Sequence, residues 1–188
     1  MPAKTLSTKE LNRVLAIVAD NRHAARNRIA VLLSFYAGLR CCEIAALKVG
    51  SVIDVMGNVK DEIRLTRHMT KGNRSRLIVV SARLQKELAA YIATLSDISP
   101  ELPLIRSQKS NHAFSANSLV QVFSRIYNTA AVANASSHSG RRTFITRLAS
   151  KGVSARVLQQ LAGHASLNTT QRYIDTQPEM LRSAVELF

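Results

Sequence analysis

The chain has 188 residues, enough for one substantial domain with a single buried core. Hydrophobic residues make up 46% of it, which excludes a disordered basic tail, and no apolar run approaches the roughly 20 residues of a membrane span. Its 26 lysines and arginines against 12 aspartates and glutamates give a formal net charge of +14, spread along the chain. This charge favours a polyanionic partner over a merely solvated basic surface. Because the start of the chain lacks a signal peptide's apolar segment, we expect a cytoplasmic, nucleoid-associated protein.

Helical periodicity dominates the first 130 residues. Ser7 and Glu10 have the spacing of a capping box at the start of a first helix. Three further helices are predicted by apolar stripes with helical spacing, which we interpret as core: Ile29, Leu32, Leu33 and Tyr36; Leu84, Leu88, Tyr91, Ile92 and Leu95; Leu119, Val122, Phe123, Ile126 and Tyr127.

A hairpin interrupts this helical series. Ile63 and Leu65 lead into a "KGNR" turn and then an apolar run over 77–80, a pattern typical of a β-hairpin or the edge of a small sheet. Residues 99–115 contain two prolines and little periodicity, so we predict a loop. The predicted fold class is therefore mainly α with a small antiparallel sheet, in one domain.

Short helices with clear end signals fill the last third. One should begin just after Ser137 or His138. The next has Ser154 as N-cap and Gly163 after its C-terminus, which puts His164 immediately past a helix end. A further helix near residue 166 is expected to carry Tyr173 about two turns along.

Seven polar residues stand at these turns and helix starts: Arg40, Glu43, Lys71, His138, Arg141, His164 and Tyr173. Their order and spacing resemble the tyrosine recombinase (phage integrase) family. That family has an Arg in a G-L-R-x-x-E box, a Lys on a β-hairpin, an H-x-x-R motif, and G-H followed nine residues later by Tyr. The resemblance covers the chain from Leu6 to about Phe188 and corresponds to the family's catalytic domain.

The chemistry of strand cleavage explains these residue types. A phosphodiester attacked by an oxygen nucleophile passes through a phosphorane whose equatorial oxygens carry negative charge, and fixed cationic donors stabilise it. Arginine suits this role because its planar fork meets two oxygens and stays protonated. The resemblance implies this role for Arg40 and Arg141. It also implies that Tyr173 is the nucleophile of a 3′-phosphotyrosine intermediate, with no metal, ATP or other cofactor.

The remaining roles also follow from the resemblance. A phenol has an ordinary pKa near 10 and needs assistance to attack. His138 would assist proton transfer, and His164 would hydrogen-bond the scissile phosphate. Lys71 would protonate the leaving 5′-oxygen, and Glu43 would brace the arginine cluster.

Two features depart from the family pattern. The family commonly has Leu and His flanking the second arginine, whereas this chain has Gly140 and Arg142. We expect Gly140 to cost a hydrophobic anchor, and Arg142 competes with Arg141 for the assignment. The family's N-terminal core-binding domain is also missing from residues 1–188, so the chain is either a fragment or a single-domain member.

The C-terminal tail of the chain suggests how subunits assemble. Pro178 can begin a last helix over 177–188 whose apolar stripe is Leu181, Ala184, Val185 and Phe188. This helix either folds back on its own domain or docks on a neighbouring subunit. The resemblance favours exchange between subunits of a tetramer on synapsed DNA sites.

Three functions compete at this stage. The resemblance favours a site-specific recombinase that acts on double-stranded DNA through a Holliday junction. A type IB topoisomerase-like relaxase would use nearly the same chemistry on one duplex. A non-enzymatic DNA-binding regulator on the same fold is the third, although it would have no need of a correctly spaced tyrosine.

Overall fold

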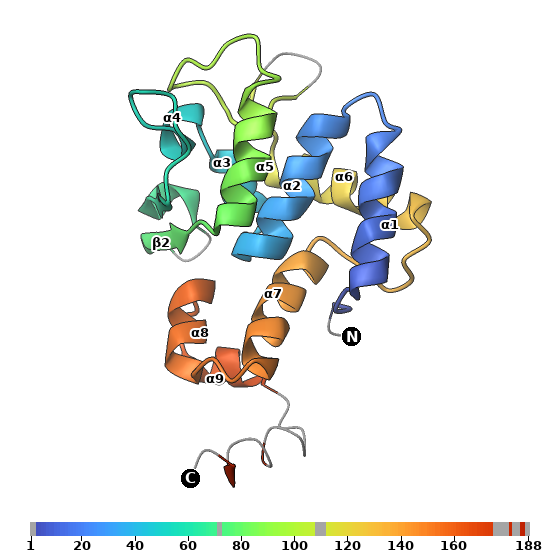
Figure 1. The fold of residues 1–188 in the computed structure, drawn as a ribbon, viewed down its shortest axis with the longest axis vertical. Coiled ribbons are helices and arrows are strands. Elements are labelled where there is room, and N and C mark those ends of the chain that lie inside the picture. Colours follow the sequence, from blue (N-terminus) through green and yellow to red (C-terminus); the bar gives the residue numbers. More distant parts are fainter. Residues whose placement is uncertain (1–2, 71–72, 108–111, 175–180, 182–184, 187–188) are drawn as a thin grey trace.

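The computed structural model describes residues 3–70, 73–107, 112–174, 181, 185 and 186. Its helices are α1 (Thr8–Ala19), α2 (Ala24–Ala37), α3 (Cys41–Ala46), α4 (Val49–Val52), α5 (Ala82–Ile92), α6 (Ala116–Thr129), α7 (Ser139–Ser150), α8 (Ala155–Ala162) and α9 (Leu167–Gln171). The strands are β1 (Glu62–Leu65) and β2 (Arg76–Val79), and η1 (Arg67–Met69) is a 3₁₀ turn between them. In Figure 1, α1, α2 and α5 lie in one group, and α7, α8 and α9 form a second group below it.

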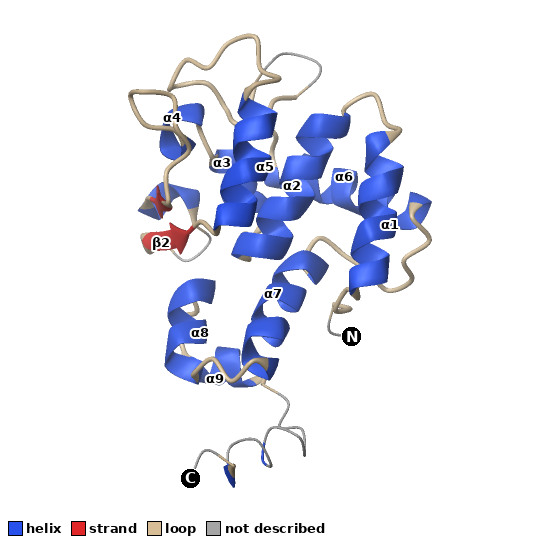
Figure 2. Cartoon of the chain, in the orientation of Figure 1, coloured by secondary structure: helices blue, strands red, loops and turns tan. Residues whose placement is uncertain are grey.

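The predicted hairpin is confirmed. β1 and β2 pair antiparallel, with Glu62 opposite Val79 and Leu65 opposite Arg76, and they form the two-stranded sheet of the described residues (Figure 2). Ile63 and Leu65 are buried, whereas Val79 on the outer face of β2 is exposed. The hairpin therefore contributes one face to the core and presents the other to solvent.

The periodic helices are confirmed, and two shorter elements are additions. The capping box of Ser7 and Glu10 is present at α1, and Ser81 and Ser115 cap α5 and α6. Segments α4 and η1 were not predicted, because one turn of helix is too short to show a 3.6-residue period. Among the described residues, no helix is long and apolar enough to cross a bilayer.

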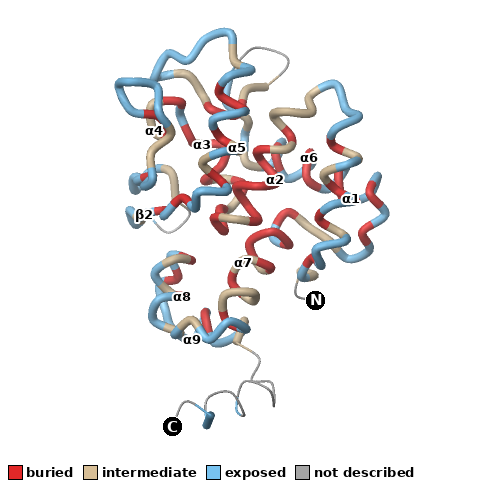
Figure 3. The backbone as a smooth tube through the Cα atoms, viewed as in Figure 1, coloured by how far each residue is buried: buried red, intermediate tan, exposed pale blue. Residues whose placement is uncertain are grey.

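A continuous apolar cluster extends from Leu6 to Val132. Figure 3 shows buried backbone along most of α2, which is covered by α1, α5 and α7. Four further buried apolar residues lie outside this cluster, in α7 and α8: Ile145, Ala149, Leu158 and Ala162. The C-terminal helices thus border the main core rather than belong to it.

Helix α7 packs closely against α2 at Gly140. A Cβ at this position would lie 2.6 Å from the Ser34 Oγ atom and 3.1 Å from the Ser34 carbonyl carbon. At such distances any larger side chain would force Ser34 or the helix backbones to shift. The expectation that Gly140 costs an anchor was therefore incomplete, because the residue lets the two helices approach each other.

Candidate active site

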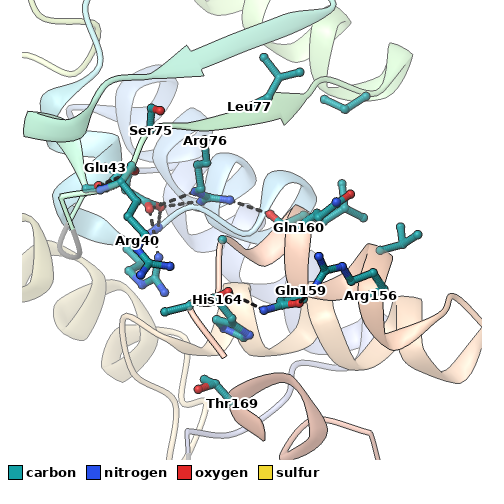
Figure 4. A pocket seen from close by; sticks show the side chains of 17 residues that line it. Arg40, Glu43, Ser75, Arg76, Leu77, Arg156, Gln159, Gln160, His164 and Thr169 are labelled. Atoms are coloured by element: carbon teal, nitrogen blue, oxygen red, sulfur yellow. Dashed lines mark hydrogen bonds and ion pairs between the residues drawn. The ribbon is translucent and has the colours of Figure 1, made fainter. Parts of the chain in front are cut away.

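A groove of about 920 Å³ opens between β2 and α8, with α3 at one end (Figure 4). Arg40, Glu43 and Arg76 line it from one side, and His164 and Thr169 line it from the other. Its volume is within the range of small-ligand sites, and its open side can admit an extended chain. Residues from distant parts of the sequence therefore meet here.

Arg40 and Glu43 are held together at the start of α3. The Arg40 backbone N–H donates to Glu43 Oε2 at 2.8 Å, and Arg40 Nη1 donates to Oε1 at 3.1 Å. Glu43 is fully buried. Burial alone would raise the pKa of Glu43, but the hydrogen bond and charge of Arg76, aided by Arg40, hold it below its ordinary value. The carboxylate is thus an ionised hydrogen-bond acceptor that holds Arg40 in place.

Arg76 is the residue that sequence analysis missed. Its Nε and Nη2 atoms donate to Glu43 at 3.2 and 2.7 Å, and Nη1 donates to the Leu161 carbonyl at 2.6 Å. One signal could have identified it. Because side chains alternate along a strand, Arg76 shares a face with buried Ile78 and Val80. A basic residue in that register has to find buried acceptors.

Arg141 is almost fully buried at the start of α7. Its Nη1 donates to the Gly38 carbonyl and its Nη2 to the Ala162 carbonyl, both at 2.6 Å. Burial, followed by the charges of Arg40 and Arg76, lowers the pKa of Arg141 to about 9, so the side chain remains cationic at neutral pH. This guanidinium ties the end of α2 to the end of α8, beside the groove.

His164 follows the C-cap of α8. Its backbone N–H donates to the Gln159 carbonyl at 3.0 Å, and its Nδ1 lies 3.0 Å from Thr170 Oγ1. Burial, followed by the charges of Arg141, Arg40 and Arg76, lowers the pKa of His164 to about 4. The imidazole is therefore neutral at physiological pH before any anion binds.

Tyr173 lies against His164. The ring centroids are 5.5 Å apart with an interplanar angle of 23°, and the Arg142 guanidinium carbon lies 5.4 Å from the tyrosine centroid. Arg142 thus contacts the tyrosine ring, while Arg141 is the buried arginine that reaches α8.

The expectation that a helix carries Tyr173 was wrong. Helix α9 ends at Gln171, and the Tyr173 N–H donates to the Thr170 carbonyl in the turn that follows. Asn and Thr residues within α9 have low helix propensity, and Thr170 engages His164. The short helix therefore ends before it reaches the tyrosine.

Three predicted residues do not line the groove, and a fourth lies outside the described residues. His138 is the exposed N-cap of α7 and, like Arg141 and Tyr173, is outside the groove lining. Lys71 lies outside the described residues. Its described neighbours Thr70 and Arg74 line the groove, and the Thr70 hydroxyl donates to the Arg74 carbonyl at 2.8 Å. In the described part of the chain, no group of three or more His, Cys, Asp or Glu residues could hold a metal ion.

Known proteins resemble this chain over most of its length. The sequence profile of the Phage integrase family matches residues 4–180. Tyrosine recombinase XerA of Pyrococcus horikoshii is 31% identical over 183 residues, which cover 97% of this chain and 60% of XerA. Tyrosine recombinase XerC of Myxococcus xanthus is 30% identical over 171 residues, which cover 86% of this chain and 54% of XerC.

Solved structures show the same fold. A crystal structure of XerA recombinase superposes with a TM-score of 0.76 at 24% identity, over 100% of this chain and 63% of that one. The catalytic domain of bacteriophage HP1 integrase gives a TM-score of 0.67 at 20% identity, over 98% of this chain and 95% of that domain. The chain spans about three-fifths of the length of the XerA relatives.

Proposed function

Because the chain belongs to the phage integrase family, we propose that it is the catalytic domain of a site-specific DNA recombinase. In this proposal it cleaves and rejoins DNA strands through a 3′-phosphotyrosine and a Holliday junction, on nucleoid DNA in the cytoplasm. The observation that best supports it is the stacking of Tyr173 on His164, next to the buried Arg141. A nucleophile, a neutral hydrogen-bonding group and a fixed cation stand together there.

The proposed cleavage step needs no external reactant. The Tyr173 oxygen attacks the scissile phosphorus, so a bond forms between phosphorus and the tyrosine oxygen and the bond from phosphorus to the 5′-oxygen breaks. His138 assists removal of the phenol proton, and Lys71 gives a proton to the 5′-oxygen. Attack by a 5′-hydroxyl of another strand reverses the chemistry and joins it to the new end.

In this proposal the arginines stabilise the negative charge that develops on the phosphate. The guanidinium of Arg141 is fixed by two carbonyls, so it does not have to reorganise when negative charge develops on the phosphate. A guanidinium carries five N–H donors, which leaves donors for the phosphate. For His164, a Thr170 hydroxyl that donates to Nδ1 leaves the imidazole proton on Nε2, from which it can donate to a phosphate oxygen.

The test is covalent capture. The 188-residue chain is incubated with a pool of nicked duplexes of random sequence, and complexes that survive SDS are recovered and sequenced. We expect adducts enriched for one sequence, undiminished by EDTA. Tyr173→Phe should abolish the adducts and leave DNA binding within about threefold, because it removes one hydroxyl and no charge.

Tyr36→Phe is the matched control, because an arginine also lies over this ring, with Arg83 at 4.8 Å. It should capture DNA at the wild-type level. Adducts without sequence enrichment, together with relaxation of any supercoiled plasmid, would favour the topoisomerase-like function. A chain that binds DNA and never forms an adduct would favour the regulator and contradict the proposal.

We also propose that the protein assembles as a tetramer on paired sites by exchange of the tail over 177–188. Most of this segment lies outside the described residues. Leu181 and Val185, two of the four stripe residues predicted there, are described and are 60% and 71% exposed. If the predicted helix forms on assembly, these two exposed apolar side chains would share its stripe and could be buried by a neighbouring subunit.

A double substitution tests this exchange. Leu181→Asp with Val185→Asp should leave binding to one half-site unchanged and should reduce multimers on a two-site duplex, measured by sedimentation. Glu186→Gln, an exposed neighbour, is the control. Wild-type assembly by the double variant would show that the tail has no part in it.

A further inference from the structure

The guanidinium of Arg76 is held by the protein at each of its three nitrogens and paired with a buried carboxylate. All three of its nitrogens donate to protein acceptors, two to the Glu43 carboxylate and one to the Leu161 carbonyl (Figure 4). The side chain is 8% exposed and its ion-pair partner is fully buried. A cation matched in this way is poorly suited to bind a DNA phosphate directly, so its part in the site has to be structural or positional.

Through Glu43, Arg76 acts on Arg40. The two Glu43 oxygens accept hydrogen bonds from both arginines. Loss of Arg76 would leave the buried Glu43 carboxylate with Arg40 as its remaining ion-pair partner among the described residues, and Arg40 would be drawn toward it. The orientation of Arg40 in the groove therefore depends on Arg76.

Arg76 also supports the turn that carries His164. Its acceptor Leu161 lies in the last turn of α8, two residues before Gly163. Gly163 has φ of +61°, and a Cβ there would overlap Arg76 Cδ. The arginine side chain thus occupies the space beside this turn, and the turn leaves room for it only because residue 163 is glycine.

Its position in the chain links these contacts to the hairpin. Arg76 is the first residue of β2 and pairs with Leu65. The hairpin connection that precedes β2 contains Lys71, the proposed general acid. One buried side chain therefore joins the hairpin strand, the Arg40 brace and the His164 turn.

We propose that Arg76 is a positioning residue, which sets the hairpin, Arg40 and His164 relative to one another for strand cleavage. This inference rests on the proposed function. A reacting group displaced by about 1 Å loses on the order of 100-fold in rate. The loss should fall on the cleavage step rather than on DNA binding.

The test uses Arg76→Gln and Arg76→Lys on the duplex enriched by covalent capture. Arg76→Gln should slow adduct formation at saturating DNA by about 100-fold and change the dissociation constant by less than about threefold. Arg76→Lys keeps the charge without the fork, so it should recover only part of the rate. A duplex with a 5′-bridging sulfur should reduce the loss in both variants, because a thiolate leaves without the proton that Lys71 supplies.

Arg64→Gln is the matched control. Arg64 is exposed, lies on β1 of the same hairpin and does not line the groove. It should leave adduct formation at saturating DNA unchanged. If Arg76→Gln weakens DNA binding and cleaves normally once saturated, Arg76 is a phosphate contact. An equal loss of cleavage on both substrates would rule out a link to Lys71.

Amide hydrogen exchange tests the positioning role of Arg76 without a measurement of activity. Arg76→Gln should increase exchange at residues 40–43 and 161–165, and Arg64→Gln should not. Unchanged exchange there would overturn the positioning role, even in a chain that forms no adduct. Absence of adducts from the wild-type chain would overturn the proposed function alone.

Discussion

Helices α1 to α6 and the hairpin pack around a continuous apolar cluster, whereas α7 to α9 are attached to that scaffold by a close helix contact and directional hydrogen bonds. Arg141 joins the carbonyls of Gly38 and Ala162, and the Leu6 N–H donates to Thr143 Oγ1 at 2.7 Å. Apolar packing tolerates small shifts, but hydrogen bonds specify atoms. The part that holds His164 and Tyr173 is therefore positioned by groups whose geometry is narrow.

Substitution of Arg141 should have the largest effect on activity, and it tests whether α7 to α9 are held separately from the apolar core. In Arg141→Met the carbonyls of Gly38 and Ala162 lose their donor and the phosphate loses a fixed cation. We expect adduct formation to fall about 1000-fold. Limited proteolysis should begin in α8 and α9 while α1 to α6 stay protected. Uniform loss of protection would mean that the two parts are one cooperative unit.

Leu33→Ala probes the apolar part. Leu33 is fully buried in α2. Removal of its side chain should lower the free energy of unfolding by about 2–5 kcal/mol in urea titration. At low denaturant the cleavage rate should stay within about threefold of wild type, because no hydrogen bond to the site is lost. A cleavage defect as large as that of Arg141→Met would contradict the division into scaffold and site.

Protonation of His164 gives a pH-dependent effect. The unfolded histidine binds a proton near its ordinary pKa, whereas burial and then the charges of Arg141, Arg40 and Arg76 lower the folded pKa to about 4. The unfolded state therefore holds more protons between these values, and the free energy of unfolding should fall as the pH drops from about 6.5 to about 4. The change attributable to His164 is at most about 3 kcal/mol.

His164→Asn should remove this part of the pH dependence, measured as the slope of unfolding free energy against pH. The contribution of Glu43 to the pH dependence remains in this variant. Because the pKa of Glu43 is lowered in the folded state, its stabilisation is lost only as the pH falls below the ordinary pKa of a glutamate. A variant with the wild-type slope would show that His164 is not held neutral.

Gly140→Ala should produce the smallest change. Alanine gains about 1 kcal/mol of helix propensity, but its Cβ would overlap Ser34, and overpacking costs about 1–3 kcal/mol. We expect a net loss of up to about 2 kcal/mol in thermal unfolding, with slower cleavage because α7 carries Arg141. Ser150→Ala at the exposed end of the same helix should be neutral. A stabilised Gly140→Ala would mean that α2 and α7 can separate without loss.

The same division decides what could be predicted from the sequence. Periodicity located α1, α2, α5 and α6, and capping residues such as Ser154 and Gly163 marked the ends of α8. Val157, an apolar residue of α8, is nevertheless 45% exposed and lines the groove. Local patterns indicate where a helix begins and ends, but they do not show which surface it will share.

Contacts between residues far apart in the chain could not be predicted from such local patterns. Arg76 and Glu43 are 33 positions apart, and Arg141 and Gly38 are 103 apart. One sequence does not distinguish a buried arginine from a phosphate-binding one. The motif predicted that Arg40, Arg141, His164 and Tyr173 converge, but not that a further arginine holds the hairpin to them.

The nucleophile is tested most directly by identification of the residue that carries the DNA. The captured adduct is digested with nuclease and protease, and the peptides are mapped by mass spectrometry. We expect one nucleotide remnant, joined through its 3′-phosphate to Tyr173. A remnant on Tyr36, Tyr91 or Tyr127, on a serine, or joined through a 5′-phosphate would contradict this prediction.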